Sequence, residues 1–244
     1  MPVRRTVRVL PLATACLIVA GLAACDPGTG PAATPTPTPS ATEEAPEPTE
    51  TPTETPTEAA VDPHPELADL VITTSGLGPL TVGVPPVGNP GAEMIALDPE
   101  YCVSDELGTP DDPARWVPAG YGTDINYMSE PAPPFYVDAD DTGVHRIDVM
   151  GVSPRTPEGI GVTSTLAELQ QTYPDLSGPF AGPVSQVWWR SDASGTVVFE
   201  TQGDADDLLP PGTPEMVILV RVLEAGVAPD FATANSGNVA GACF

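Results

Sequence analysis

The chain has 244 residues, of which 41% are hydrophobic, and its 34 acidic residues face only eight basic ones, for a formal net charge of −26. All eight basic residues are arginines. So acidic a surface repels the phosphate backbone of nucleic acids, which excludes nucleic acid as a class of partner. The lack of lysine excludes mechanisms that need a Schiff base or a phosphate-loop lysine.

The first 24 residues have the organisation of a secretory signal peptide. Three arginines precede an apolar run over Val9–Ala20, which is shorter than the ~20 residues needed to cross a bilayer. The run leads to Leu22-Ala23-Ala24-Cys25, which resembles the bacterial lipobox. The resemblance implies cleavage before Cys25 and acylation of Cys25, which anchors the chain on the extracytoplasmic face of the cell membrane. The alternative is an ordinary signal cut near Ala24, which leaves a free secreted protein.

Residues 25–65 are predicted to be the lipidated cysteine followed by a disordered tether. From Pro31 to Thr57 the chain is almost only Pro, Thr, Ala, Ser and Glu, and no large apolar side chain occurs between Asp26 and Ala60. Such a segment cannot bury enough apolar surface to offset its ordering entropy. Its prolines favour polyproline II at ~3.1 Å per residue, so the tether would span on the order of 100 Å.

Residues 66–244 are predicted to form an α+β domain, mainly an antiparallel sheet with one or two short helices packed on it. The turn-forming segments 138–143 and 191–195 each separate two strand-like runs, which indicates two hairpins. The run Met216–Leu223 is almost wholly apolar, which favours a central strand covered on both faces. Strands are expected at Leu70–Thr73, Leu80–Gly83, Tyr121–Met128, Phe135–Val137, Val144–Val149, Val184–Arg190, Thr196–Glu200 and Met216–Leu223.

The clearest helix signal follows Thr165. Thr165 and Glu168 have the spacing of a capping box, and Leu166, Leu169 and Tyr173 then share one helix face. Pro174 ends this helix. A second, shorter helix is expected over Gly91–Leu97.

The order of these elements predicts an internal repeat, with halves at 66–152 and 153–244. Each half has a glycine-rich turn, a helix and a hairpin. This order resembles the tandem helix-on-sheet modules of the β-lactamase inhibitor protein and of BamE-type lipoproteins. The resemblance implies that one helix lies over an antiparallel meander in each half. The resemblance supports a fold class and indicates no function. The prolines Pro85, Pro86 and Pro90 depart from the pattern where the first helix would begin.

Two cysteines remain once Cys16 leaves with the signal and Cys25 is acylated. Cys102 and Cys243 form an even pair in an oxidising compartment, so a disulfide is predicted. The chain-entropy model gives about 4–5 kcal/mol for a loop of this size. Neither cysteine lies in a CxxC motif, which disfavours a redox or metal role.

Candidate sites outside the cysteines are few, and no motif assigns a catalytic residue, a metal ligand or a cofactor. His145, which shares a strand face with Ile147 and Val149, is interpreted as a packed or edge residue. Oxygens of Asp138, Asp140 and Thr142 resemble the start of a calcium loop, although the closing Glu is missing and an acidic turn is the simpler interpretation. Trp188 and Trp189 face opposite sides of a strand, so that one of them, exposed beside Arg190, would form a binding anchor; the alternative is that both tryptophans are buried.

Taken together, these features predict a non-enzymatic cell-envelope lipoprotein. Its extracytoplasmic domain would bind an envelope protein or a cell-wall component, and its lipid anchor would contact the membrane. One alternative is a calcium- or small-ligand-binding module that uses the acidic turns. Another is a hydrolase that uses a pair of carboxylates.

Overall fold

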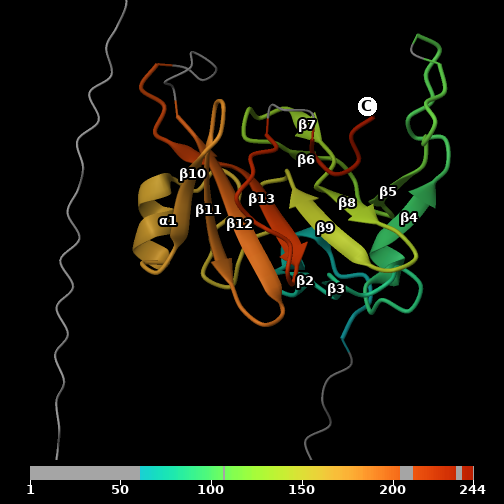
Figure 1. Ribbon diagram of the computed structural model, residues 1–244, viewed down its shortest axis with the longest axis horizontal. Helices are drawn as coiled ribbons and strands as arrows, with labels where there is room; N and C mark the ends of the chain where they lie inside the picture. Colours follow the sequence, from blue (N-terminus) through green and yellow to red (C-terminus); the bar gives the residue numbers. More distant parts are fainter. Residues whose placement is uncertain (1–60, 107, 204–210, 235–237, 244) are drawn as a thin grey trace, which may run out of the picture. The chain divides into compact units, whose positions relative to one another are not determined.

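The computed structural model describes residues 61–106, 108–203, 211–234 and 238–243 (Figure 1). An eight-stranded antiparallel sheet dominates it, in the order β10-β11-β12-β13-β9-β8-β5-β4. These strands are β4 (Ile95–Asp98), β5 (Arg115–Pro118), β8 (Phe135–Ala139), β9 (Val144–Val149), β10 (Ser177–Ala181), β11 (Gln186–Ser191), β12 (Gly195–Gln202) and β13 (Met216–Glu224).

The described residues also contain two small sheets, two 3₁₀ turns and one α-helix. The small sheets are β1 (Ile72–Thr73), β2 (Gly76–Leu77) and β3 (Leu80–Thr81), and β6 (Asp124–Ile125) with β7 (Pro131–Ala132). The 3₁₀ turns are η1 (Leu67–Asp69) and η2 (Ala92–Met94), and the α-helix is α1 (Leu166–Thr172). The predicted α+β fold, sheet-dominated with a short helix, is therefore confirmed. None of the helices in the described ranges is both long and apolar enough for a membrane span.

Strand β13 is central, and both of its faces are covered. It pairs with β12 on one side and with β9 on the other, and Val217 to Leu223 are all buried. The predicted central strand is confirmed. Both predicted hairpins are also present, as β8–β9 and β11–β12. The expected strand Tyr121–Met128 is wrong over most of its length, since only Asp124–Ile125 pairs.

The two predicted halves each contribute four adjacent strands to the large sheet. Strands β4, β5, β8 and β9 come from residues 66–152, and β10 to β13 come from residues 153–244. The halves meet where β13 pairs with β9, in the register Val220↔Val149. The four strands of each half fit the sheet part of the predicted repeat, whereas the first half has only the 3₁₀ turn η2 in place of its expected helix.

The helix expected over Gly91–Leu97 is wrong. One 3₁₀ turn, η2, occupies Ala92–Met94, and β4 follows it directly. The main chain of Gly91 crosses β3 so closely that a Cβ there would lie 2.4 Å from the amide nitrogen of Leu80. This approach and the buried Met94 hold the chain against the core where the second helix was expected.

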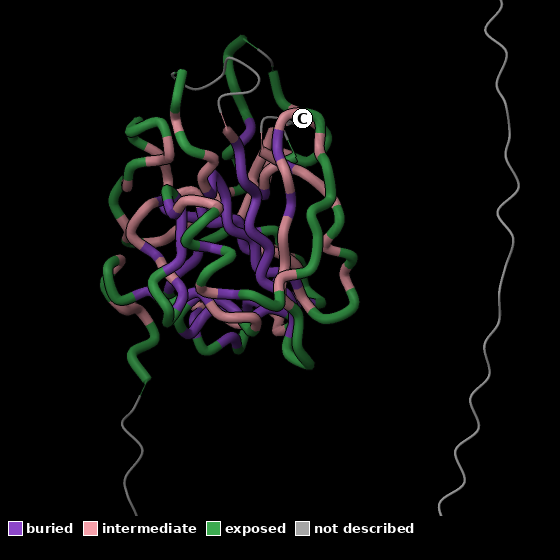
Figure 2. The backbone as a smooth tube through the Cα atoms, turned by 90° about the vertical axis from the view of Figure 1, so that its left-hand side faces the viewer, coloured by how far each residue is buried: buried purple, intermediate pink, exposed green. Residues whose placement is uncertain are grey.

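The main core lies on one face of the large sheet. Apolar side chains from residues 70–94 and 160–173 cover this face and pack on strands from both halves, including Phe135, Ile147 and Phe199. Figure 2 shows the buried residues gathered along the strands, with exposed residues on the surrounding loops. The capping box predicts α1 correctly, since Thr165 Oγ1 accepts from the amide of Glu168 at 3.2 Å and the Glu168 carboxylate accepts from the amide of Thr165 at 2.8 Å.

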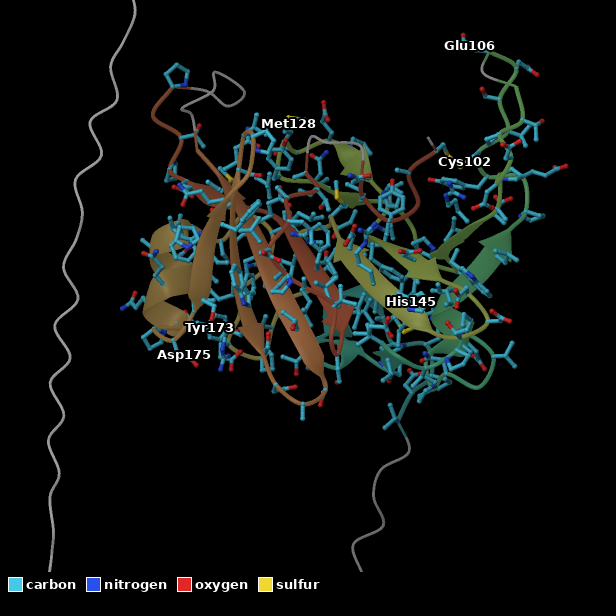
Figure 3. All side chains as sticks on the ribbon, in the orientation of Figure 1. Cys102, Glu106, Met128, His145, Tyr173 and Asp175 are labelled. Carbon is cyan, nitrogen blue, oxygen red and sulfur yellow. A yellow bond between two sulfur atoms is a disulfide. The ribbon has the colours of Figure 1, made fainter. Side chains whose placement is uncertain are left out.

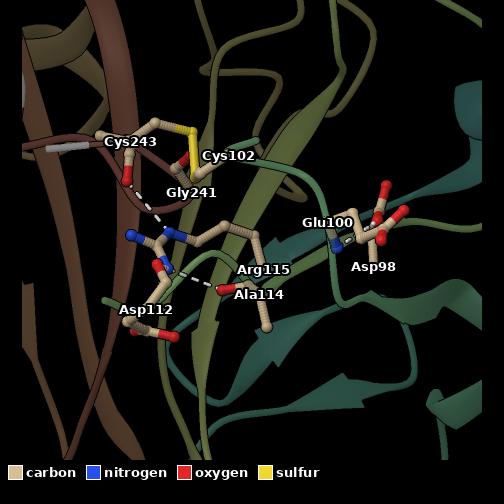
Figure 4. The surroundings of a disulfide bond; sticks show 9 residues. Asp98, Glu100, Cys102, Asp112, Ala114, Arg115, Gly241 and Cys243 are labelled. Atoms are coloured by element: carbon tan, nitrogen blue, oxygen red, sulfur yellow. Dashed lines mark hydrogen bonds and ion pairs between the residues drawn. A yellow bond between two sulfur atoms is a disulfide. The ribbon is translucent and has the colours of Figure 1, made fainter. Parts of the chain in front are cut away.

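The opposite face carries the C-terminal cover, defined here as the described residues 227–234 and 238–243. Val227, Phe231 and Ala232 pack on a small apolar cluster of that face. The predicted pair Cys102 and Cys243 forms a disulfide with an S–S distance of 2.09 Å. Beside it, Arg115 donates from Nε to the carbonyl of Ala242 at 3.0 Å (Figure 4). The end of the chain is thus tied to the first half of the sheet.

A buried ionic cluster lies beneath the C-terminal cover. Arg221, Glu200 and Asp148 have no solvent exposure, and Arg221 Nη2 lies 3.6 Å from Glu200 Oε2. Glu200 also accepts hydrogen bonds from the amides of Thr233 and Ala234, at 2.9 and 3.1 Å. The cover therefore provides the donors that a buried carboxylate requires.

Candidate functional site

The acidic segment 138–143, whose oxygens resemble the start of a calcium loop, is a hydrogen-bonded hairpin turn, as the simpler interpretation expects. Asp140 Oδ1 accepts from the amide of Thr142 at 2.7 Å and from its hydroxyl at 2.6 Å. These bonds lower the pKa of Asp140. Asp138 is exposed on β8, opposite Arg146. Across the described residues, no three His, Cys, Asp or Glu side chains are grouped to hold a metal ion. The oxygen of Asp140 therefore serves to close the turn.

His145 joins this turn to the end of the central strand. Its Nδ1 lies 2.7 Å from Glu224 Oε1, and its Nε2 lies 3.1 Å from Asp140 Oδ1. The hydrogen bond with Glu224 is the main cause of a raised His145 pKa. The Thr142 hydroxyl is 3.4 Å from Nε2 but donates its proton to Asp140. His145 therefore links two carboxylates, Asp140 and Glu224, by ion pairs. The imidazole does not accept the Thr142 hydroxyl proton, because that proton is donated to Asp140.

The expected anchor Trp188-Trp189-Arg190 is divided among three environments. Trp188 faces the main core and lies opposite Phe199 in the sheet. Trp189 faces the other side and packs under the C-terminal cover. Both indoles are half-buried in these layers, which agrees with the alternative of burial, and neither is an exposed anchor. Alternation along β11 places Arg190 on the same face as Trp188, near the end of the strand, where its side chain is 40% exposed.

Arg190 lies in a cleft of about 380 Å³, called here the Arg190 cleft. Three separate parts of the chain form it. They are residues 72–74 around β1, the loop Thr156–Glu158, and the end of α1 with the neighbouring strands β10 to β12. Its apolar floor is made of buried side chains from the main core, Ile72, Val197 and Phe199.

One wall of the cleft is built around Tyr173, the residue that ends α1. Figure 3 labels Tyr173 and Asp175 at the lower end of this helix. The Arg190 guanidinium carbon lies 4.5 Å from the centre of the Tyr173 ring, and Arg190 Nε lies 3.6 Å from Asp175 Oδ1. The Tyr173 hydroxyl is 2.6 Å from Glu158 Oε2 and 2.7 Å from Thr156 Oγ1. Burial is the main cause that raises the pKa of Tyr173 to about 12, so the phenol stays protonated near neutral pH.

Two carboxylates of the cleft have lowered pKa values. The hydrogen bond from Tyr173 is the main cause that lowers the pKa of Glu158. On the other side, the Thr74 hydroxyl donates to Asp192 Oδ2 at 2.6 Å and is the main cause that lowers the pKa of Asp192. With Asp175, three acidic side chains and one arginine line the cleft. Its local charge is therefore negative.

Most of this site could not be found from the sequence. Arg190 belonged to the expected anchor and Asp192 to an expected turn, but Glu158 and Asp175 carried no signal. Thr74 and Asp192 are 118 positions apart and meet only because the fold brings β1 to the β11–β12 hairpin. Cys25, the predicted lipidation site, lies outside the described residues.

The sequence matches no family model and no curated protein. Among solved structures, the chain is similar to the uncharacterized protein YfeY from Escherichia coli. The match has 13% sequence identity and a TM-score of 0.37, and it covers 63% of this chain and 99% of that chain. No function is transferred from it.

Proposed function

We propose that this chain is a lipid-anchored envelope protein whose domain binds, without catalysis, a positively charged ligand in the Arg190 cleft. The ligand is a segment of an envelope protein or a cell-wall component that carries an amine or guanidinium group. The anchor is Cys25, and the tether lets the domain reach a ligand at a distance from the membrane. The domain contributes the cleft and its charge.

The charge distribution of the cleft is the observation that carries the proposal. Three carboxylates surround a single arginine, and Arg190 is already engaged by Asp175 and by the face of Tyr173. Clefts lined by one sign of charge concentrate ligands of the opposite sign. The apolar floor of Ile72, Val197 and Phe199 favours a ligand with a hydrocarbon portion next to its charge.

Binding fits the geometry better than carboxylate-based hydrolysis does. Such a hydrolase needs one carboxylic acid that keeps its proton near neutral pH, and enzymes achieve this by raising its pKa. Glu158 and Asp192 have the opposite shift, because the hydroxyls of Tyr173 and Thr74 stabilise their charged forms. Both are suited to hold a cation and unsuited to donate a proton.

Two experiments test the two parts of the proposal. Incorporation of labelled palmitate in growing cells tests the anchor, and it should be lost in Cys25→Ala. The cleft is tested by calorimetric titration with a lysine–leucine dipeptide blocked at both ends, against the same dipeptide acetylated on the lysine side chain. We expect heat only with the charged dipeptide.

Variants locate the binding in the cleft. Glu158→Gln and Asp192→Asn keep the size of each side chain and one acceptor oxygen while removing its charge, so affinity should fall about tenfold or more in each. Asp111→Asn, an exposed residue outside the cleft, is the matched control and should not change the affinity. Equal affinity in all four proteins would contradict the assignment of the cleft.

A further inference from the structure

A second concave surface, called here the cover pocket, lies between the large sheet and the C-terminal cover. It has a volume of about 320 Å³. Strands β5, β8 and β9 line one side of it, and residues 238–242 line the other. The charged residues of its lining are two arginines and two aspartates, namely Arg115, Arg146, Asp112 and Asp138. The cover pocket therefore offers both signs of charge, whereas the Arg190 cleft is negative.

The charges alternate across the strands of the pocket. Asp138 lies directly opposite Arg146 in the pairing of β8 with β9. On the other side of β8, the pair Trp116 and Val137 sets the register with β5. In that register, Arg115 is the residue of β5 that lies next to Asp138. Residues that pair directly in this way project from the same face of a sheet. One aspartate thus stands between two arginines beneath the C-terminal cover.

The cover holds both arginines in place through its main chain. Arg115 donates from Nε to the carbonyl of Ala242 at 3.0 Å, and Arg146 donates from Nη2 to the carbonyl of Asn238 at 2.9 Å. The two side chains are accordingly only 18% and 17% exposed. Since a carbonyl group carries no net charge, these bonds position the guanidinium groups without neutralising them.

Each arginine keeps a terminal nitrogen for a ligand. Arg115 uses Nε for the cover and Nη1 for Asp112 and the carbonyl of Ala114, and its Nη2 donates to none of the described residues. Arg146 Nε lies 3.4 Å from Asp148 Oδ2, and within the described ranges its Nη1 has no hydrogen-bond acceptor. Guanidinium groups make strong, charge-assisted hydrogen bonds to carboxylates. The pair of arginines therefore suits a carboxylate.

Asp138 supplies the opposite charge. It is exposed, lines the pocket, and forms no hydrogen bond or ion pair with another residue that the structure describes. A ligand with only negative charge would be repelled by a chain of formal net charge −26, and one with only positive charge would be repelled by the two arginines. A ligand that carries one charge of each sign avoids both penalties.

We infer that the cover pocket binds a zwitterion, either a free amino acid or a dipeptide with free ends. Its carboxylate accepts from Arg115 and Arg146, and its ammonium group pairs with Asp138. The volume of the pocket lies at the small end of the ~300–1,000 Å³ range of ligand sites, which matches a ligand of this size. This inference does not depend on the Arg190 cleft.

Calorimetric titration of the mature chain with Cys25→Ser tests the inference. The probes are alanyl-alanine with both ends free, the same dipeptide acetylated at its amino end, and the same dipeptide amidated at its carboxyl end. We expect binding of the free form and affinities about tenfold or more lower for both blocked forms. No heat with the free form, or equal affinity for a blocked form, would overturn the inference.

Amide chemical shifts locate the bound dipeptide. Ala139 and Gly241 line the cover pocket and should shift with the free dipeptide, whereas Thr74 and Asp192 line the Arg190 cleft and should not. Shifts confined to the Arg190 cleft would mean that the amine of the probe binds there, and would overturn the inference. A titration in Glu158→Gln/Asp192→Asn should leave the affinity unchanged, so the two proposals fail separately.

Matched variants assign the two charges of the ligand. Asp138→Asn should lower the affinity for the free dipeptide about tenfold but not that for the acetylated one, which has no ammonium group to lose a partner. Asp141→Asn makes the same change at an exposed residue outside the pocket and should alter neither. Arg115→Gln should weaken the free dipeptide but not the amidated one, and urea unfolding checks that this variant is folded. Equal weakening of every probe in Asp138→Asn, or the same loss in Asp141→Asn, would contradict the assignment.

Discussion

Replacing Arg221 by methionine should strongly destabilise the domain. Arg221 is fully buried, with its guanidinium 3.6 Å from Glu200 Oε2 and 4.3 Å from the centre of the Phe231 ring. Asp148, also fully buried, faces the same guanidinium, and burial raises the pKa of Asp148. Arg221→Met keeps the packing volume but leaves two buried carboxylates with less compensating charge.

The magnitude follows from what remains around those carboxylates. Removing one partner of a buried ion pair costs about 3–5 kcal/mol. Here Glu200 keeps hydrogen bonds from the Ser185 hydroxyl at 2.6 Å and from the amides of Thr233 and Ala234. Since these donors continue to stabilise the charge, we expect a loss of about 3 kcal/mol, at the lower end of that range.

Urea unfolding at pH 7 measures this loss in Arg221→Met, and the double variant Glu200→Gln/Arg221→Met provides the control. The double variant removes one buried charge along with the arginine, so it should be more stable than the single variant by about 1–2 kcal/mol. A loss below about 1 kcal/mol in the single variant, or no recovery in the double variant, would refute this account of the cluster.

Three further outcomes are expected. Because the His145 pKa is raised above 6.5, its stabilisation is complete below that pH and is lost as the pH rises through the folded-state pKa. The difference in unfolding free energy between wild type and His145→Gln should thus be larger at pH 6 than at pH 9, and Glu224→Gln should reduce this trend, with the remainder due to Asp140. Thr165→Ala should cost about 1 kcal/mol in urea unfolding and Thr165→Gly only a few tenths, and equal losses would contradict the capping role. Replacing Cys102 and Cys243 together by serine opens a loop closed over a separation of 141 residues, so the free energy of unfolding in urea should fall by up to about 5 kcal/mol. An unchanged free energy of unfolding would show that the C-terminal cover holds without the disulfide.

The sequence predicts those parts of the fold whose signals are local. The apolar run of β13, the turn residues of both hairpins and the capping box at Thr165 each depend on neighbours within a few positions. The strand β10 was missed because all of its residues are exposed and one is Pro179, so an edge strand has no hydrophobic pattern to reveal it. Strand β4 was mistaken for a helix because Met94–Leu97 is an unbroken apolar run without the apolar–polar alternation of a half-buried strand. In the structure, Leu97 of this run is 50% exposed.

The candidate site was less predictable because it depends on distant parts of the chain. Alternation along β11 predicts that Trp188 and Trp189 face opposite sides, and the structure places Trp188 against the main core and Trp189 under the C-terminal cover, so that neither stands exposed beside Arg190. The sequence of the C-terminal cover has no periodic pattern from which its length or path could be predicted. The partners of Arg190, such as Asp175, are ordinary surface residues in the sequence and gain a role only from the packing of α1.

The pairing of β9 with β13 sets the order in which the sheet can form. Within the second half, each strand pairs with the next one along the chain, whereas Val149 must find Val220, 220 − 149 = 71 positions later. Contacts so distant in sequence form slowly, because a long loop must close before any hydrogen bond forms. Until the last strand arrives, β9 is an open edge that can pair with another molecule. We therefore expect aggregation during folding to begin at β9, in the interval before β13 closes the sheet.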